Sequence, residues 1–321
     1  MCLRGKKIIM NKILLVGAGP MAEAYAAVLQ AMYVDFDVVG RSEISAKNFE
    51  AKTNKKVFVG DDAAQILLTA KNYSAAIIAV SMEQLGNVTA QLLEKNFNKI
   101  LVEKPGGMNA AEIKKVAKIS EEKNATVLLA YNRRFYSSVF AAEKIILEDG
   151  GLTSMHFEFT EWSHVISPLK KADGVKENWF LGNSTHVVDL AFSLAGNPKE
   201  ISCYKNGSLS WHPNGAAFAG AGITEKNVLF SYNANWAAPG RWSVEWLTNQ
   251  HRIILKPLEK LQIQKIGSVV VEEIAMDDSL DTKFKPGLYK QVEAFLQHDY
   301  SRFITIHQQA ENALLYDKMV G

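Results

Sequence analysis

Short apolar runs recur along the first 130 residues of this 321-residue chain, separated by longer amphipathic segments. Each run is rich in strand-forming residues and is bounded by polar residues or glycine, which is the pattern of a strand buried on both faces of a sheet. Strands that alternate with helices of about 10–15 residues predict a doubly wound parallel sheet of the α/β class. The predicted strands are Lys12–Val16, Asp35–Val39, Lys56–Val59, Ala75–Val80, Ile100–Val102 and Thr126–Ala130.

Helix signals lie between these strands. Asp61 or Asp62 is placed to cap one helix, and Asn109 to cap a later one. The predicted helices are Met21–Met32, a segment that runs through Leu68, Glu83–Lys95 and Ala110–Lys123.

Beyond residue 150 the pattern changes to alternation with a period of two. Leu152–Trp162 alternates apolar and polar residues, which predicts a strand with two distinct faces. Other strand candidates follow after short polar breaks, so we expect an antiparallel or mixed sheet. These candidates are Val228–Tyr232, Trp242–Trp246, Arg252–Leu255 and Val269–Glu273, and helices are predicted over Ser184–Ala195, over Leu288–His298 and after Ile306.

The length and the change of pattern predict two domains, residues 1–130 and residues 131–321. We expect the C-terminal helices, about 287–321, to pack back on the first domain. Met10 begins a chain that reads naturally without its leader, so residues 1–9 are interpreted as an upstream extension.

Composition adds mainly exclusions. The chain is 48% hydrophobic and 22% charged with a net charge of +2, which gives no electrostatic case for nucleic acid or an acidic membrane. No apolar run reaches the roughly 18 residues that a membrane-spanning helix needs. The two cysteines and the histidines have no metal-ligand or disulfide spacing, so we expect no metal and a reducing, cytoplasmic location.

A glycine-rich turn follows the first strand directly, in the order Gly17-Ala-Gly-Pro-Met-Ala22. Gly17 would permit a tight turn and Gly19 the close approach of a pyrophosphate, while Ala22 replaces a third glycine at a packing position. The helix N-terminus, which includes Pro20 and Met21, would attract the phosphates. Such turns also join strands to helices without a ligand, but the strand–turn–helix context favours dinucleotide binding.

The second strand ends in Gly40-Arg-Ser42, where NAD-binding sites usually carry an acidic residue. Arg41 and Ser42 offer a cation and a hydroxyl to a 2′-phosphate, which favours NADP over NAD. In the alternative interpretation Arg41 is merely solvated, and Asp37 or Glu43 contacts the ribose.

Glu103-Lys104-Pro105 ends a predicted buried strand, and ligands of open α/β sheets bind beyond such carboxyl ends. Glu103 and Lys104 are therefore candidate cofactor-binding residues, together with Val80 and Ser81 at the end of the preceding strand. The alternative is an ordinary surface turn.

Together with Tyr131-Asn-Arg-Arg-Phe135 and His186-Val-Val-Asp189, these motifs resemble the glucose-fructose oxidoreductase / inositol dehydrogenase (Gfo/Idh/MocA) family. The resemblance implies a Rossmann domain, a C-terminal domain with a large open, mostly antiparallel sheet, and homodimers or homotetramers formed through that sheet. It also implies hydride transfer between NAD(P) and a carbohydrate-like alcohol, and a cis peptide bond at Lys104–Pro105. The motifs that carry it are Gly17–Ala22, Leu101–Pro105, Tyr131–Phe135 and His186–Asp189.

The proposed chemistry rests on Lys104 and His186. Burial would lower the pKa of Lys104 towards neutrality, so its amine could hydrogen-bond the reacting oxygen. His186, with an ordinary pKa near cellular pH, could exchange the proton. Asp189, one helical turn later, could orient the imidazole or cap neighbouring backbone. The resemblance implies an aspartate four residues before the histidine, but Gly182 stands there.

Substrate contacts are expected from residues near these two. Asn183 follows Gly182 but cannot act as a base, because an amide does not ionise at neutral pH. Arg133 or Arg134, with Asn132, could hold a carboxylate or phosphate, or could tie the two domains together. Trp162 offers an aromatic face to a sugar, although most of the six tryptophans suit a core or an interface better.

The sequence therefore predicts an NADP-preferring oxidoreductase that acts on a sugar, an inositol or a nucleotide-linked sugar. One alternative is a reductase of a non-carbohydrate cyclic substrate. Another is a cofactor-binding homologue with impaired catalysis, which Gly182 favours.

Overall fold

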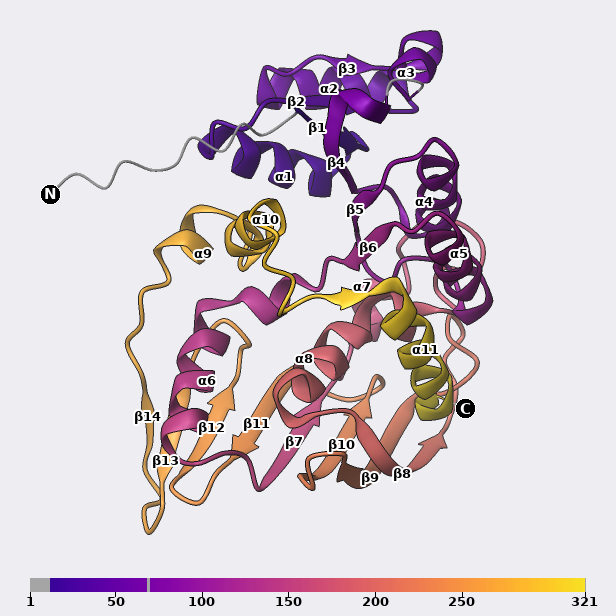
Figure 1. The fold of residues 1–321 in the computed structure, drawn as a ribbon. Helices are drawn as coiled ribbons and strands as arrows, with labels where there is room; N and C mark the ends of the chain where they lie inside the picture. Colours follow the sequence, from indigo (N-terminus) through magenta and orange to yellow (C-terminus); the bar gives the residue numbers. More distant parts are fainter. Residues whose placement is uncertain (1–11, 68–69, 321) are drawn as a thin grey trace, which may run out of the picture.

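Two sheets organise the part of the chain that the computed structural model describes, residues 12–67 and 70–320 (Figure 1). The upstream segment, residues 1–9, and the predicted helix end at Leu68 lie outside the described residues. The first sheet has seven strands in the order β15-β6-β5-β4-β1-β2-β3. Its members are β1 (Lys12–Val16), β2 (Phe36–Val39), β3 (Val57–Phe58), β4 (Tyr73–Ile78), β5 (Lys99–Val102), β6 (Thr126–Leu129) and β15 (Ile304–Thr305).

Strands β1 to β6 of this sheet pair in parallel, which confirms the predicted α/β class. Alternate residues of each strand enter two separate cores. Leu15 and Ile77 pack with helix α1 (Pro20–Ala31), whereas Leu14 and Ile78 pack with α4 (Leu85–Glu94) and α5 (Ala110–Glu122). Burial on both faces explains the continuous apolar runs in the sequence.

The helix ends agree with the capping signals in one case and differ in another. The Asn109 side chain accepts the amide of Glu112 at 3.0 Å, as predicted for the cap of α5. Helix α3 (Gly60–Leu67) instead begins before Asp61 and Asp62, so the prediction that either residue caps it was wrong. Both acids lie in the first turn, where they complement the positive end of the helix dipole.

The second sheet has eight strands in the order β14-β13-β12-β11-β7-β10-β9-β8. Only the pair β7–β10 is parallel, so the expected mostly antiparallel sheet is confirmed. Its members are β7 (Ser154–Glu158), β8 (Pro198–Asn206), β9 (Ala217–Thr224), β10 (Leu229–Asn235), β11 (Ser243–Leu247), β12 (His251–Leu255), β13 (Gln262–Lys265) and β14 (Val271–Glu273).

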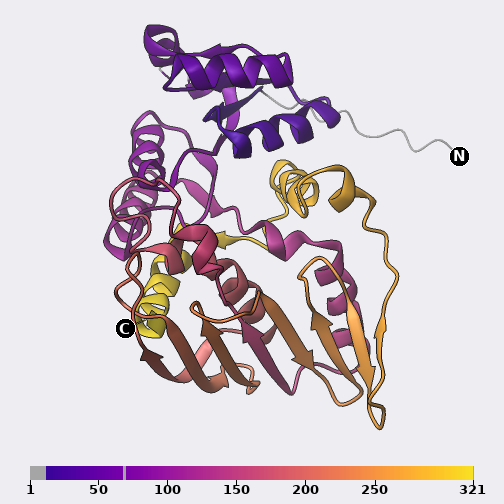
Figure 2. The ribbon, with the colours of Figure 1, turned by 180° about the vertical axis from the view of Figure 1, so that it is seen from behind.

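Helices cover one face of the second sheet (Figures 1 and 2). They are α6 (Ser137–Glu148), α8 (Thr185–Ala195) and α11 (Ile306–Val320). Seen from behind in Figure 2, the strands β8 to β12 form the near surface without a described helix over them. Among the described residues, no helix is long and apolar enough to cross a membrane.

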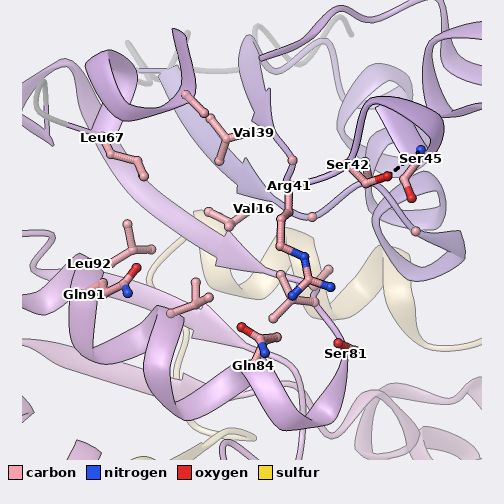
Figure 3. A pocket seen from close by; sticks show the side chains of 18 of the residues that line it. Val16, Val39, Arg41, Ser42, Ser45, Leu67, Ser81, Gln84, Gln91 and Leu92 are labelled. Atoms are coloured by element: carbon pink, nitrogen blue, oxygen red, sulfur yellow. Dashed lines mark hydrogen bonds between the residues drawn. The ribbon is translucent and has the colours of Figure 1, made fainter. Parts of the chain in front are cut away.

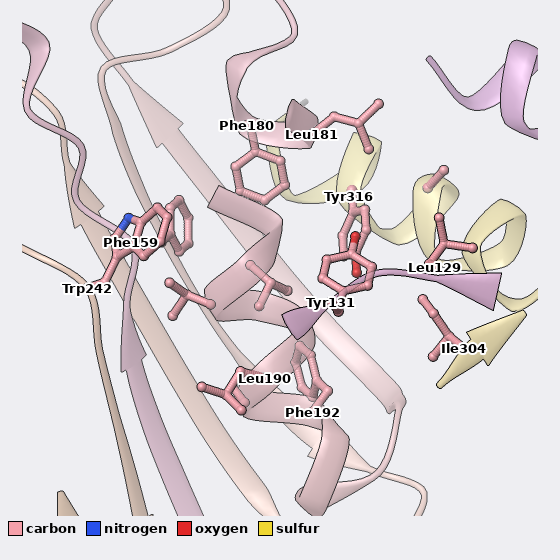
Figure 4. Packing of buried hydrophobic residues seen from close by; sticks show 14 of the residues in the cluster. Leu129, Tyr131, Phe159, Phe180, Leu181, Leu190, Phe192, Trp242, Ile304 and Tyr316 are labelled. Carbon is pink, nitrogen blue, oxygen red and sulfur yellow. The ribbon is translucent and has the colours of Figure 1, made fainter. Parts of the chain in front are cut away.

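The C-terminal segment returns to the first sheet. Strand β15 pairs antiparallel with β6, and α11 packs against α5. Helix α10 (Leu288–Leu296) packs on α1. Figure 4 shows the shared core, in which Leu129 and Ile304 of the first sheet meet Tyr131, Tyr316 and Leu190. One continuous apolar cluster therefore joins the two sheets.

Candidate active site

A pocket of about 300 Å³ lies at the carboxyl ends of β1, β2 and β4 (Figure 3). Gly17 has φ +124°, and a Cβ there would lie 2.3 Å from the carbonyl oxygen of Ala79, so a tight turn at this position requires glycine. Gly19 caps α1 without a side chain, and a Cβ on it would meet nothing within 4 Å. Open space before a helix N-terminus fits the pyrophosphate of a dinucleotide.

The remaining residues of the glycine turn are placed for this role. Pro20 opens α1, where its missing N–H costs no hydrogen bond. Ala22 is fully buried at the helix–strand contact, and the half-buried Met21 packs beside the core. Val80 and Ser81 also line the pocket, at the end of the strand that the sequence predicted.

The charges at the pocket are one-sided. Among the described residues its lining includes the cations Arg41 and Lys95 but no carboxylate. Arg41 and Ser42 lie in the pocket together with Ser81 and Gln84 (Figure 3). The Ser42 hydroxyl oxygen also accepts the amide of Ser45 at 3.5 Å and so caps α2 (Glu43–Thr53).

Asp37, the residue that the alternative interpretation assigned to the ribose, is engaged elsewhere. Its carboxylate accepts from the Tyr73 hydroxyl at 2.7 Å and pairs with the Lys12 amine at 2.7 Å. Neither Asp37 nor Glu43 lines the pocket.

Lys104 stands just beyond β5, and the Lys104–Pro105 peptide bond is cis as predicted. Its half-buried amine donates to the carbonyl of Gly182. Burial and the neighbouring Arg133 lower the pKa of Lys104 to about 8, against the opposing charges of Glu103 and Glu161. A half-buried amine held in this way does not fit the alternative of an ordinary surface turn.

Glu103 contacts helix α1 and, through it, lies close to α10. Its carboxylate accepts from the Tyr25 hydroxyl of α1 at 2.8 Å, and that hydroxyl also lies 3.5 Å from Gln291 of α10. Burial raises the pKa of Glu103. The carboxylate thus faces α1 rather than the pocket lining, although its residue precedes Lys104.

His186 lies on α8 and is only 6% exposed. Burial, with Arg133 and Lys104 nearby, holds its pKa well below the ordinary value. The expectation of a histidine that titrates near cellular pH is therefore wrong, because the site desolvates and repels its cationic form. Its buried Nδ1 has no hydrogen-bond partner among the described residues.

The expectation that Asp189 orients the imidazole of His186 is also wrong, because Asp189 pairs with another residue. Its buried carboxylate forms a bidentate pair with Arg134, at 2.8 Å to Nε and 2.7 Å to Nη2. Arg134 also donates to the Arg302 carbonyl at 3.3 Å. Arg134 thus ties the segment after β6 to α8 and to the segment before β15.

Arg133 has a different environment. Its guanidinium carbon lies 4.8 Å from the centre of the Trp242 ring, and Nη1 donates to Asn132 at 3.2 Å. It forms no ion pair with a carboxylate in the described part of the chain. Asn132 itself is 4% exposed, and its side chain donates to the Pro286 carbonyl at 2.9 Å. It therefore holds the segment before α10 against the turn after β6.

Gly182 lies in a single π-helical turn, Phe180–Ser184, that leads into α8. A Cβ at this position would lie 2.7 Å from the sulfur of Met82. The Met82 side chain therefore occupies the space that a side chain at position 182 would need. What position 182 presents to Lys104 is a backbone carbonyl.

Sequence reasoning missed Glu161, which is 2% exposed beside this turn. Its carboxylate accepts from the Asn183 amide at 2.9 and 3.1 Å and from the Ser184 hydroxyl at 2.8 Å. It also pairs with Arg241 at 3.7 Å. Burial raises the pKa of Glu161. A single glutamate at the end of a strand carries no local signal for this role.

The half-exposed Trp162 borders the same cluster. Its indole N–H donates to the Gly240 carbonyl at 2.9 Å, and the Arg241 guanidinium stacks 4.7 Å from its ring centre. Trp236 and Trp246 are buried in the core, in keeping with the interpretation made for most tryptophans.

A Rossmann sheet with this glycine turn and a pocket beside it is the arrangement that binds a dinucleotide. Residues 11–131 match the family model of Gfo/Idh/MocA, described as an oxidoreductase family with an NAD-binding Rossmann fold. The match covers the N-terminal domain and there confirms the resemblance found in the sequence.

Solved structures share the fold over nearly the whole chain. A levoglucosan dehydrogenase in complex with NADH and levoglucosan has 17% identity and a TM-score of 0.75, with 96% of each chain covered. The UDP-N-acetylglucosamine 3-dehydrogenase GnnA from Acidithiobacillus ferrooxidans has 13% identity and a TM-score of 0.71, covering 98% of this chain and 99% of that chain. An oxidoreductase from Thermotoga maritima has 16% identity and a TM-score of 0.74, with 97% and 96% covered. No curated protein matches the chain in sequence.

Proposed function

We propose that this protein is an NADP-preferring oxidoreductase acting on a C–OH or C=O group of a sugar, an inositol or a nucleotide-linked sugar. The observation that carries the proposal is Lys104, whose half-buried amine has a pKa near 8 and stands one strand away from the nucleotide pocket. The sugar-linked names of two structural neighbours, levoglucosan dehydrogenase and UDP-N-acetylglucosamine 3-dehydrogenase, support the substrate class.

The nucleotide pocket supports NADP as the preferred cofactor. A 2′-phosphate adds negative charge, and Arg41 and Lys95 line a pocket with no described carboxylate. Asp37, which would favour a free ribose hydroxyl, is held by Lys12 and Tyr73. When bound, the cofactor would supply a nicotinamide that accepts or donates the hydride.

Proton handling falls mainly on Lys104. With a pKa of about 8 the amine is near balance between its two forms at cellular pH, so it can give a proton to a developing alkoxide or take one from an alcohol. The Gly182 carbonyl holds the amine in place. His186, neutral because of its lowered pKa, would serve as a hydrogen-bonding group for a substrate hydroxyl rather than as a charged acid.

Arg133 supports an acidic group on the substrate. A largely buried guanidinium without a carboxylate partner is costly, and a bound carboxylate or phosphate would complete it. A nucleotide-linked sugar meets this requirement, and so does a sugar that carries a carboxylate. Trp162 and Asn183 lie at the neighbouring Glu161–Arg241 cluster.

A screen of the NADPH-bound protein tests the proposal. Cofactor fluorescence and absorbance would be followed against neutral sugars, inositols, sugar acids and nucleotide sugars, in both reaction directions. We expect turnover with at least one carbohydrate, with the best substrates among the anionic ones. If nothing in the panel turns over or perturbs the bound cofactor, the alternative of a non-catalytic homologue gains. Gly182, which brings no side chain to the site, is the observation that favours that alternative.

A further inference from the structure

We propose that Glu161 is the positioning residue for Lys104, and that it holds the Gly182 carbonyl against the lysine amine and supplies negative charge beside it. This inference rests on the proposed function, because it assumes that the state of Lys104 matters to the reaction. The inference gives the buried carboxylate of Glu161 a role in the proposed reaction.

The contacts form a short continuous path. The Glu161 carboxylate is held by the side chains of Asn183 and Ser184, at 2.8–3.1 Å. These two residues directly follow Gly182, whose carbonyl accepts the Lys104 amine. A carboxylate that fixes both residues after the carbonyl also fixes the direction in which the carbonyl points.

The cost of burying this carboxylate argues for a use of its charge. Glu161 is 2% exposed, and the one ion pair that it forms with a described residue, to Arg241, is long at 3.7 Å. Arg241 is half-exposed and stacks on Trp162 and Trp242, so much of its charge is screened by solvent. A glutamine oxygen could accept the hydrogen bonds that Asn183 and Ser184 donate to Oε1, without the desolvation penalty of an anion, although not the second bond that Asn183 donates to Oε2.

Lys104 is surrounded by charges of both signs. Arg133, from the turn after β6, and Lys285, before α10, disfavour its protonated form, as does burial. Glu103, its neighbour in the chain, and Glu161 favour it. Glu103 shares its carboxylate with Tyr25, and His186 on α8 is neutral, so Glu161 is the carboxylate that approaches from the C-terminal domain.

The sign of the effect follows from these charges. Removing the negative charge of Glu161 favours the neutral amine and lowers the pKa of Lys104 below its value of about 8. In ketone reduction the protonated amine is the useful form, so the alkaline loss of activity would move to lower pH. In alcohol oxidation the activity would rise at lower pH instead.

Trace acetylation with acetic anhydride measures this directly, because only the neutral amine reacts. The NADPH-bound full chain would be labelled between about pH 6 and pH 10, and the extent at Lys104 read by mass spectrometry. In Glu161→Gln we expect the midpoint to fall by about one pH unit. Glu245→Gln is the matched control. It removes a carboxylate of the second sheet that pairs with Arg252, and it should leave the midpoint of Lys104 unchanged.

A second pair of variants guards against misfolding. Arg241→Gln and the double variant Glu161→Gln/Arg241→Gln leave no unpaired guanidinium, and the midpoint should be lower in the double variant than in Arg241→Gln. Equal midpoints within both pairs would overturn the inference. Since labelling needs no substrate, a lowered midpoint in a protein that turns over no carbohydrate would sustain the role of Glu161 and refute the proposed function instead.

Discussion

Lys104 is the residue on which the proposed chemistry depends most. Replacing it by methionine keeps the length of the side chain but removes the amine. We expect turnover to fall by about 10²–10⁴-fold, the range for loss of a general acid or base. NADPH binding should change by no more than about twofold, since Lys104 is absent from the nucleotide pocket lining. Initial rates and cofactor-fluorescence titrations measure the two effects.

Lys99→Met is the matched control, because Lys99 starts the same strand at the far end from the pocket. Unchanged turnover in Lys104→Met would remove the lysine from the mechanism. An equal loss in Lys99→Met would mean that the strand, not the amine, is responsible.

Arg41 is expected to select the cofactor. Arg41→Ala should weaken NADPH binding by about 10–100-fold, the value of one charge-assisted contact, and leave NADH binding nearly unchanged. Lys47→Ala on the exposed face of α2 serves as control for net charge. Tighter binding of NADH than NADPH by the unaltered protein would contradict the assignment.

Residue-level prediction from the sequence succeeded where the signal was local. The glycine turn, Arg41 and Lys104 stand at strand ends that the apolar runs predicted, and the structure places them there. The prediction failed where contacts between residues far apart in the sequence determine the partner of a side chain. Asp189 shares a helix with His186, yet Arg134, from the turn after β6, pairs with it. Glu161 meets its partners only after folding.

At the scale of elements, the turn between β1 and α1 contains two glycines, Gly17 and Gly19, whose replacement by alanine should have very different effects on stability. Gly17→Ala adds a Cβ at 2.3 Å from a backbone oxygen with φ +124°, so we expect a loss of stability of about 2–4 kcal/mol and of cofactor binding. Gly19→Ala adds a Cβ in open space and should keep the stability while weakening NADPH binding. Thermal denaturation and cofactor titration of both variants would check this, and an equally stable Gly17→Ala would refute it.

The pair between Arg134 and Asp189 joins the turn after β6 to α8. Asp189→Asn leaves a largely buried guanidinium without its anion, so we expect a loss of about 3–5 kcal/mol in denaturant unfolding. Glu148→Gln, which breaks an exposed pair with Lys144 on α6, should cost less than about 0.5 kcal/mol. Similar effects in the two variants would show that the buried pair has no special weight.

Elements with strong periodicity were predictable, and weakly patterned ones were not. Parallel strands β1 to β6 are buried on both faces and therefore read as apolar runs. Strand β9 is rich in glycine and alanine, and β8 is mostly exposed, so neither was predicted. Helix α2 buries only Ala46 and Phe49, which leaves a polar sequence without an apolar stripe.

At the scale of the whole molecule, the uncovered face of the second sheet supports the expected homodimer or homotetramer. A shallow hollow over β8, β9 and β10 has small residues at its base and the exposed Tyr204 and Leu229 on its rim. We expect light scattering to give a mass that is a multiple of the chain mass. Tyr204→Asp/Leu229→Asp should lower it, because two charges would be buried in the interface.

Leu147→Asp is the control for added charge, since Leu147 is also exposed but lies on α6, over the opposite face of the sheet. A monomeric unaltered protein, or dissociation by the control alone, would contradict an interface on the open face.

The position of strand β15 in the first sheet affects the order in which the parts of the protein can fold during synthesis. Residues 304–305 complete the edge of the first sheet, and α11 then covers α5, although both come from the last twenty residues. On the ribosome, the nucleotide-binding half emerges first but waits with the edge of β6 unpaired until residues 304–305 have been made. A chain cut short before residue 300 would lack β15 and leave the edge of β6 exposed. Such a truncated chain could pair with another chain at this edge and aggregate.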